Sequence, residues 1–280
     1  MRRSTVLGTA ALVFGLVLAP TGGAVGSQQA QTIRLAAVLD AEQEVPSPTG
    51  DVADARGTFV ATATRTGGGA ELEWRLTFNG LTGAAGAAHI HLGAPGQAGG
   101  VAVPLCGPCQ SPASGTATVD AAVLRALERG GAYANVHTAA NAAGEIRGQI
   151  GVTATVTARL NARQEVPRPK GRANRARGTF RATVTKIGTT GTLAWRVTFG
   201  RLTGRAVAAH VHVARPGRAG PVAVPLCGPC RSGARGTATL RPSVFAALEA
   251  GRAYVNVHTA RNPAGEIRGQ LPRVTLRLGQ

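Results

Sequence analysis

Aromatic residues are scarce in this 280-residue chain, at 4% of the composition, with two Trp and two Tyr. Recognition of single-stranded nucleic acid depends on stacking bases against such rings, so that class of function has little material here. Charged residues reach only 16%, while hydrophobic residues make up 44%. This balance excludes a disordered polycation, although the formal net charge is +18. The 39 Gly and 16 Pro favour many turns and short strands over a helix bundle.

Long apolar runs are also missing, apart from one near the N-terminus. Arg2 and Arg3 precede the apolar run Val6–Ala19, and small residues follow it. The run is too short for a permanent anchor and is typical of a secretory signal peptide, which we assign to residues 1–26. The arginine pair also resembles a twin-arginine signal, although an ordinary signal uses the same residues. We therefore expect a secreted, periplasmic or cell-envelope protein with no transmembrane segment after signal cleavage.

The rest of the chain repeats itself after 121 positions. Between residues 35 and 150, 70 of 116 positions are identical to their counterparts, without a gap. All six His, all four Cys, both Trp and both Tyr fall in matched pairs. A period of this length is too long for a solenoid unit and is typical of two complete domains. We predict one domain over residues 32–152 and a second over residues 153–280.

Each repeat has the pattern of a β domain. Gly57–Arg65 and Leu72–Phe78 are rich in Thr, Val and aromatic residues, and the glycines between them indicate a hairpin. Ala121–Arg129 has apolar residues at helical spacing and ends before two glycines, which predicts one short helix. The fold class is therefore all-β, with two tandem antiparallel sandwich or barrel-like domains. Gly151 and Val152 alone separate the repeats, so we expect the domains to dock closely. The other strands expected in the first repeat are Ala87–Leu92, Val101–Leu105, Gly115–Val119, Ala132–Thr138 and Glu145–Ile150.

Three histidines in each repeat are the strongest candidates for a binding site. His89 and His91 are two residues apart on an expected strand, so their side chains leave the same face. His137 lies on another strand, and three imidazoles with an open position suit zinc or copper. The sequence therefore predicts a metal site in each repeat. The six candidate ligands are His89, His91, His137, His210, His212 and His258.

Polar residues on the neighbouring strands give these histidines candidate supporting groups. Glu145 is expected to orient a ligand imidazole while Arg147 holds the carboxylate. A buried hydrogen-bonded network that joins the strands without metal explains the same residues and stays open. Nucleophilic catalysis has thin support, because Thr138 and Thr259 are the only candidate nucleophiles that both repeats retain near the cluster. The candidate supporting residues are Asn135, Glu145, Arg147, Asn256, Glu266 and Arg268.

The four cysteines form two Cys-Gly-Pro-Cys tetrapeptides. Cys106 and Cys109 follow a short Val-rich strand and precede loop residues, and Cys227 and Cys230 repeat the arrangement. Export favours a local disulfide in each loop. Thiol–disulfide exchange and a shared four-cysteine zinc site remain alternatives.

These motifs together resemble the CHRD domain, which occurs in the developmental regulator chordin and in bacterial exported proteins. The resemblance rests on Leu39–Pro46, His89–Gly99 and Tyr133–Gln149. It covers residues 35–150 and 156–271, and it implies a sandwich-like extracytoplasmic domain without an established catalytic activity. The His-x-His pair is also similar to that of copper–zinc superoxide dismutases. Three histidines per repeat are too few for their two-metal site, so no dismutase activity is expected.

The net charge is concentrated in the second repeat. Residues 32–150 hold 7 basic and 10 acidic residues, whereas residues 151–280 hold 22 and 3. We expect the second domain to contact an anionic envelope polymer, a lipid surface or an acidic protein, with no specific nucleic-acid binding. A basic surface that serves solubility alone is the other interpretation. The candidate contact residues are Arg163, Arg168, Lys170, Arg172, Arg175 and Arg177.

The sequence thus predicts an exported, non-enzymatic module that binds a partner or builds the cell envelope. A zinc- or copper-binding protein is the alternative function, and no other cofactor is indicated. A small-molecule or catalytic site at the histidine cluster is the least favoured interpretation.

Overall fold

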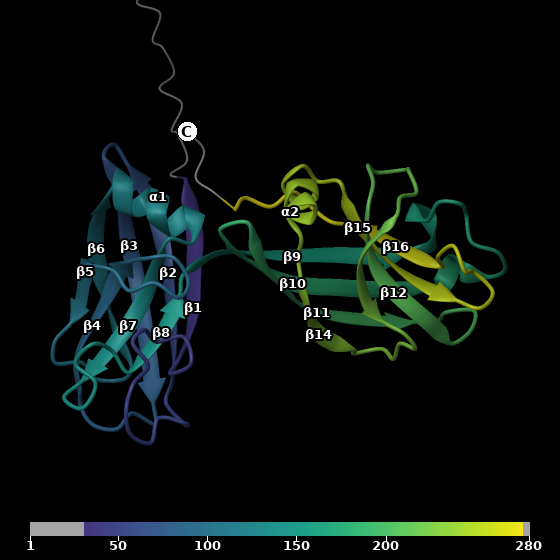
Figure 1. Ribbon diagram of the computed structural model, residues 1–280. Helices are drawn as coiled ribbons and strands as arrows, with labels where there is room; N and C mark the ends of the chain where they lie inside the picture. The colour runs from purple at the N-terminus through teal and green to yellow at the C-terminus, as the bar shows by residue number, and fades with distance from the viewer. Residues whose placement is uncertain (1–30, 277–280) are drawn as a thin grey trace, which may run out of the picture.

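Two β-rich lobes make up the chain, and the computed structural model describes residues 31–276 of it (Figure 1). The predicted signal peptide lies outside the described residues. Within residues 31–276, no helix combines the length and the apolarity that crossing a membrane requires.

The first lobe is formed by the first repeat. Its elements are β1 (Thr32–Asp40), β2 (Arg56–Thr66), β3 (Gly69–Asn79), β4 (Ala85–Leu92), β5 (Val101–Cys106), β6 (Ala113–Asp120), α1 (Ala121–Arg129), β7 (Ala132–Thr138) and β8 (Ile146–Gln149).

The second lobe repeats this order and adds two short 3₁₀ turns. Its elements are β9 (Gly151–Asn161), η1 (Ala162–Gln164), η2 (Ala173–Arg175), β10 (Arg177–Ile187), β11 (Thr190–Gly200), β12 (Ala206–Val213), β13 (Val222–Cys227), β14 (Arg235–Thr239), α2 (Pro242–Glu249), β15 (Ala253–Thr259) and β16 (Ile267–Gln270).

Each lobe is an antiparallel sandwich of two four-stranded sheets. In the first repeat one sheet has the order β1-β2-β3-β6 and the other β8-β7-β4-β5. The second repeat has β9-β10-β11-β14 and β16-β15-β12-β13. A single residue pair, Asp40 with Arg147, joins the two sheets of the first lobe along one side. The strands at the other side, β5 and β6, each have one hydrogen-bonded neighbour, so the sandwich stays open.

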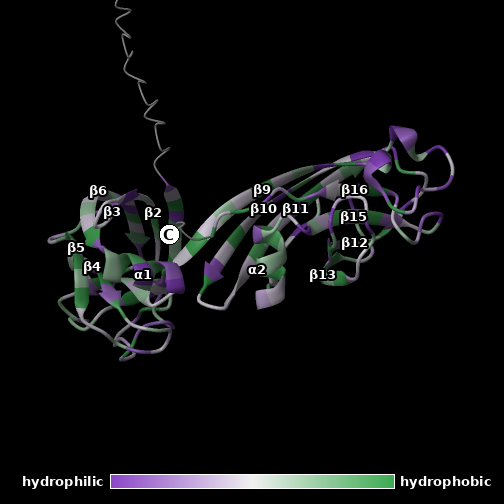
Figure 2. Cartoon of the chain, turned by 90° about the horizontal axis from the view of Figure 1, so that it is seen from above, coloured by the Kyte–Doolittle hydropathy of each residue, from purple (hydrophilic) through white to green (hydrophobic). Residues whose placement is uncertain are grey.

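Alternating side chains build the core between the two sheets. Along β2, Phe59, Ala61 and Ala63 are buried while the residues between them face outward. Figure 2 shows the same alternation of hydrophobic and hydrophilic residues along the long strands of the second repeat. Because strand side chains point to opposite faces in turn, one face of each sheet meets its partner and the other meets solvent. The all-β prediction is confirmed, and the sandwich form is the one adopted.

The repeats are joined by a strand that serves both lobes. β9 begins at Gly151, and its first residues pair with Arg34–Ala36 of β1 before the strand continues along β10. Gly130, at the end of α1, approaches the β10–β11 turn so closely that a Cβ there would lie 2.6 Å from the backbone nitrogen of Gly188. The two lobes are therefore in direct contact. The domain boundary placed after residue 152 falls inside β9.

Candidate metal centre

In each repeat the three histidines converge on one face of a single sheet. This sheet is β8-β7-β4-β5 in the first repeat and β16-β15-β12-β13 in the second. His89 and His91 lie on β4, where Ala88 and Ile90, at the alternate positions of the strand, point into the core. On β7, His137 pairs with Ala87 and therefore lies diagonally across from His89. One ring nitrogen from each histidine falls within 4.8 Å of the other two. The spacing in the sequence and the register of two strands together produce this cluster.

Backbone carbonyls fix the tautomers of two imidazoles. His91 Nδ1 lies 3.0 Å from the carbonyl oxygen of Gly99, and His137 Nδ1 lies 3.0 Å from that of Ala142. A carbonyl oxygen only accepts, so each Nδ1 must carry the hydrogen and each Nε2 must carry the lone pair. His91 Nε2 is buried and has no hydrogen-bond partner among the described residues. Metal-binding histidines are commonly oriented in this way, by a carbonyl on the nitrogen that does not bind the ion.

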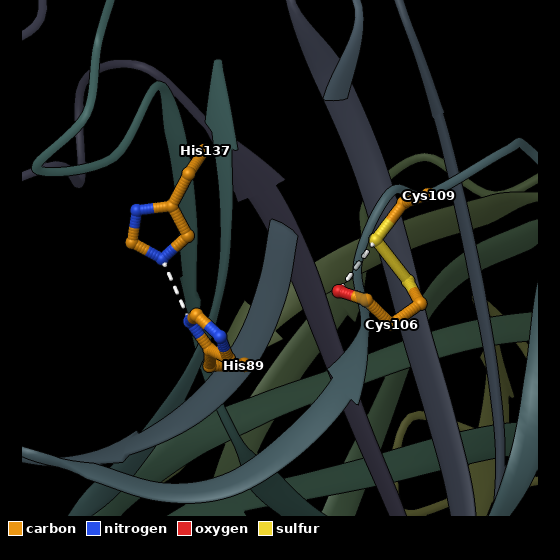
Figure 3. Close-up of a disulfide and its surroundings, with 4 residues drawn as sticks. All are labelled: His89, Cys106, Cys109 and His137. Carbon is orange, nitrogen blue, oxygen red and sulfur yellow. Dashed lines mark hydrogen bonds between the residues drawn. A yellow bond between two sulfur atoms is a disulfide. The ribbon is translucent and has the colours of Figure 1, made fainter. Parts of the chain in front are cut away.

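The third imidazole of the cluster, that of His89, directs a ring nitrogen at His137. His89 Nδ1 lies 3.1 Å from His137 Nε2, and Figure 3 shows the two rings directed at one another. Since His137 Nε2 is the acceptor, His89 Nδ1 is the donor in this contact. Moving that hydrogen to Nε2 would leave three lone pairs directed at one space. The donor set, three imidazoles without thiolate or carboxylate, fits what zinc and copper accept.

The second repeat reproduces this geometry atom by atom. His210 Nδ1 lies 3.1 Å from His258 Nε2. His212 Nδ1 lies 2.9 Å from the carbonyl oxygen of Gly220, and His258 Nδ1 lies 2.9 Å from that of Pro263. His212 Nε2 is again buried without a partner among the described residues.

Burial favours the neutral form of most of these imidazoles. Desolvation lowers the pKa of His89 and His137, and the neighbouring imidazoles lower both further. The same causes lower the pKa of His258, and they bring the pKa of His210 to about 4. Neutral imidazole is the form that binds a metal ion, so these shifts favour the ligand state of the four histidines.

A stack of side chains supports the buried histidine. The Tyr133 ring lies parallel to that of His91, with centroids 5.1 Å apart, and the Arg147 guanidinium covers the other face of Tyr133 at 3.5 Å. Arg147 is 1% exposed, and it donates to the carbonyl oxygens of Ala94 and Gln97. Arg147 therefore ties the loop that precedes β5 to the histidine face. Tyr254 and Arg268 form the matching stack on His212.

The predicted supporting role of Glu145 needs correction. Its carboxylate accepts hydrogen bonds from the backbone and hydroxyl of Thr82, from the hydroxyl of Thr138 and from the amide of Asn141. These contacts join the loop between β3 and β4 to the end of β7 and the loop that follows it, and no hydrogen bond in the described residues joins Glu145 to an imidazole or to Arg147. Glu266 has the same set of partners in the second repeat.

A second buried carboxylate was missed by the sequence reasoning. Glu44 is 3% exposed, and it accepts from the Asn135 side-chain amide at 2.9 Å, whereas Asn135 Oδ1 has no partner among the described residues. Burial raises the pKa of Glu44 to about 7, against the lowering effects of the Val45 N–H and of Arg147. Glu165 is also buried, but the Asn256 side-chain amide donates to the carbonyl oxygen of Ala264 at 3.4 Å, and Glu165 Oε2 has no partner among the described residues. Burial raises the pKa of Glu165 to about 7. The recurrence of Gln-Glu-Val-Pro in both repeats was the available signal.

The cysteines form one disulfide within each tetrapeptide. Cys106 is joined to Cys109 and Cys227 to Cys230, each with its Cα atoms 5.3 Å apart. No cysteine among the described residues is free, so neither a four-thiolate zinc site nor a reduced dithiol is present. In Figure 3 the first disulfide lies to one side of the imidazole pair.

Five of the basic candidates lie in the connection between β9 and β10, and the sixth, Arg177, is the first residue of β10. This connection contains η1 and η2, and its backbone is held by Asn262, whose side-chain oxygen accepts from the Lys170 N–H at 2.6 Å. None of the candidates reaches the histidine cluster through the hydrogen bonds of the described residues. Six side chains here are exposed, those of Arg163, Arg168, Lys170, Arg172, Arg175 and Arg177.

Protein-family models identify the family to which both lobes belong. The CHRD domain model matches residues 35–150 and 156–271, one match for each lobe. The chain belongs to the CHRD domain family. No curated protein and no solved structure matches it. As a tandem CHRD protein it is a binding or structural module, and its histidine clusters are a property of both CHRD domains.

Proposed function

We propose that this tandem CHRD protein is exported and non-enzymatic, and that each domain binds one zinc or copper ion through three histidines. The observation that carries the proposal is the unpartnered Nε2 of His91, repeated at His212. A metal ion would occupy the position toward which these lone pairs converge. Such an ion polarises and orients whatever it contacts, which suits a binding module.

The competing account, a purely structural network, explains the cluster less well. A network that stabilises strands satisfies its buried polar atoms, because each unsatisfied atom costs about 1–3 kcal/mol. Here His91 Nε2 and His212 Nε2 are buried without a partner among the described residues, as are the neighbouring Asn135 Oδ1 and Asn256 Oδ1, so the same atoms are left unsatisfied in both repeats. The remaining contacts of His91 and His137, to backbone carbonyls, are those of metal ligands.

Support for a non-enzymatic role comes from the two threonine hydroxyls that end the strands carrying His137 and His258. Thr138 is buried and donates to Glu145 at 2.6 Å, and Thr259 donates to Glu266 at the same distance. A hydroxyl that donates to a carboxylate inside a loop junction is held away from any substrate. Export is supported by the two disulfides, which persist in oxidising compartments.

Metal content of the purified full chain tests the proposal directly. We expect about two ions per chain for the wild type, one for His137→Ala or His258→Ala alone, and none for the double variant. The two single variants control each other, because each leaves the other domain intact. If the wild type and the double variant take up equal amounts of zinc and copper, the proposal is wrong.

A second candidate function, contact between the second domain and an anionic partner, is supported by the exposed basic connection. The partner would be an anionic envelope polymer, a lipid surface or an acidic protein. The first repeat has Glu42, Asp51 and Asp54 where the second has Arg163, Arg172 and Arg175. The triple variant Arg163→Glu, Arg172→Asp, Arg175→Asp therefore restores residues that the same fold already carries. It should elute from an anionic matrix at lower salt than the wild type, and unchanged elution would argue against the connection as a contact site.

A further inference from the structure

The outward face of the sheet β9-β10-β11-β14 carries a row of arginines across three neighbouring strands. Arg181 on β10 pairs with Arg196 on β11, and Arg196 pairs with Arg235 on β14. Residues paired in this way point to the same face, and neighbouring strands lie about 4.8 Å apart. On β9, Arg159 lies two residues from Thr157, the partner of Arg181, and so shares this face. We call Arg159, Arg181, Arg196 and Arg235 the arginine row.

The arginine row is exposed, whereas the residues that flank Arg159, Arg181 and Arg196 along their strands are buried. Phe180 and Ala182, on either side of Arg181, are 0% and 5% exposed and point into the core. The row borders a shallow depression of about 440 Å³ whose lining includes Arg181, Arg196 and Arg235. Hydroxyls of Thr155, Thr183 and Thr237 are available in the same depression. Figure 1 shows the four strands lying side by side across the second lobe.

No carboxylate of the second repeat is available to neutralise the row. The repeat has three acidic residues. Glu165 and Glu266 are buried at 2% and 0% exposure. The third, Glu249, lies 3.8 Å from Lys186. Like charges placed directly opposite one another on a sheet are destabilising, so the row lowers the stability of its own strands.

The first repeat shows that the fold does not need these arginines. The positions that match Arg159, Arg181 and Arg235 hold Val38, Val60 and Ser114, and only Arg75 is kept in place of Arg196. Val38 and Val60 are 66% and 47% exposed, so they too lie on the outer face. A similar depression of about 540 Å³ is present there, but Val60 and Ser114 replace two of its arginines, and its charged lining residues are Arg34, Glu73 and Arg75. The difference between the repeats therefore concerns a surface and not the core.

We propose that the arginine row is the docking surface for an extended acidic polysaccharide with a carboxylate on its sugars. The proposal rests on the second candidate function and specifies both the site and the partner. A guanidinium binds a carboxylate through two parallel hydrogen bonds, and the row offers several guanidiniums one strand spacing apart along a line. The threonine hydroxyls between them suit the hydroxyls of the sugar rings.

The surroundings of the row favour a polysaccharide over other polyanions. Single-stranded nucleic acid is held by stacking on exposed aromatic rings. In the second repeat Phe180, Phe245 and Tyr254 are buried, and Phe199 is half-buried. Trp195 contributes to the lining of the depression but is itself 7% exposed, so none of these rings is free to stack on a base. Insertion into a lipid surface needs apolar side chains on the contacting face. The large exposed hydrophobic residues of the described second repeat are Val207 and Val222, which lie on the other sheet.

The test compares the wild type with a row variant and a reciprocal variant of the full chain, on immobilised polygalacturonate at several salt concentrations. The row variant Arg159→Val, Arg181→Val, Arg235→Ser carries the residues of the first repeat and should bind at least 10-fold more weakly, with a shallower salt dependence. The reciprocal variant Val38→Arg, Val60→Arg, Ser114→Arg builds a second row beside Arg75 and should bind more tightly than the wild type. Far-ultraviolet circular dichroism checks the fold, and a row variant with Gln at the same three positions serves if the Val form does not fold.

The outcomes separate this proposal from the broader anionic-partner function. If the row variant binds as the wild type does while the Arg163/Arg172/Arg175 variant loses binding, the row proposal is overturned and the partner function stands. If neither variant loses binding, both fail. Equal or tighter row-dependent binding to DNA or to anionic phospholipid vesicles overturns the choice of polysaccharide. The proposal is supported if the row variant loses binding to polygalacturonate, the reciprocal variant gains it, and neither change is seen with DNA or with vesicles.

Discussion

His89 and His137 lie on neighbouring strands with Nδ1 of the first 3.1 Å from Nε2 of the second. Tetrahedral ligands about 2.0–2.1 Å from a zinc ion are about 3.3 Å apart, so this pair already forms one edge of such a site. A hydrogen bond between His89 and His137 holds this separation without a metal ion. Under the proposed function, binding of an ion would require that the hydrogen of His89 move from Nδ1 to Nε2. Little reorganisation is needed for binding, and this preorganisation favours affinity.

Zinc or copper should raise the thermal unfolding temperature of the protein. A ligand that binds only the folded state stabilises it by about 2.7 kcal/mol at a concentration 100 times its dissociation constant. Differential scanning fluorimetry with and without the metal measures the shift. His91→Ala/His212→Ala should lose it, whereas Thr153→Ala, on the shared strand and outside both clusters, should retain it. An equal shift in both variants would contradict the assignment of ligands.

Metal uptake should persist well below neutral pH and then fall. Protons compete with the metal for the imidazole lone pairs, and burial lowers the pKa of His89, His137 and His258 below 6.5 and that of His210 to about 4. We therefore expect the pH of half-maximal uptake to lie below 6.5. Equilibrium dialysis against a metal buffer at fixed free-metal concentration measures it. Half of the uptake lost by pH 6.5 would mean that the imidazoles titrate as exposed groups do.

Glu44→Gln and Glu165→Gln should stabilise the protein at pH 8 more than at pH 4. The folded pKa of each carboxyl is raised from 4.5 to about 7, so the folded state binds more protons than the unfolded state between these values. Stability is therefore lost as the pH rises from 4.5 to 7, by on the order of 3 kcal/mol for each carboxyl. Urea unfolding of metal-free protein at several pH values gives the difference between variant and wild type. A difference that does not change with pH would contradict the raised pKa.

Arg147→Met should destabilise the first domain by about 2–4 kcal/mol and weaken its metal site. The substitution leaves the carbonyl oxygens of Ala94 and Gln97 without their donor and removes the guanidinium from the Tyr133 ring. Arg75→Met, on the exposed face, is the matched control and should change stability by less than about 0.5 kcal/mol. Urea unfolding measures stability, and metal content measures the site. If Arg147 had only a structural role, Arg147→Met would lower stability and leave the metal content unchanged.

The elements that carry local signals were predictable from the sequence. The helix predicted over Ala121–Arg129 has these bounds in the structure, because Asp120 accepts from the N–H groups of Ala122 and Val123 and Gly130 ends the helix with φ of 68°. The histidine cluster was also predictable, because strand alternation placed His89 and His91 on one face. Both signals depend on near neighbours in the chain.

Features that depend on register or on irregular segments were not predictable. Glu145 was assigned to the face of Arg147 by alternation, but it precedes β8 and belongs to the turn after Asn141, so its side chain joins the loops. Glu44 lies in a loop with no periodicity. Arg181, Arg196 and Arg235 form a row only through the pairing of three strands, and no spacing in the sequence reveals that alignment.

The shared strand β9 affects how the two lobes can act on one target. Two modules on a flexible tether search for a second contact at an effective concentration set by tether length. Here the pairing of Arg34–Ala36 with Gly151–Thr153 replaces the tether, so the two histidine faces keep one separation and one orientation. A target with matching epitopes gains avidity at no further entropic cost, and a target with another spacing gains none. If the tandem protein binds a two-site target, the pairing of β9 with β1 would make the spacing of the two sites decide how tightly it binds.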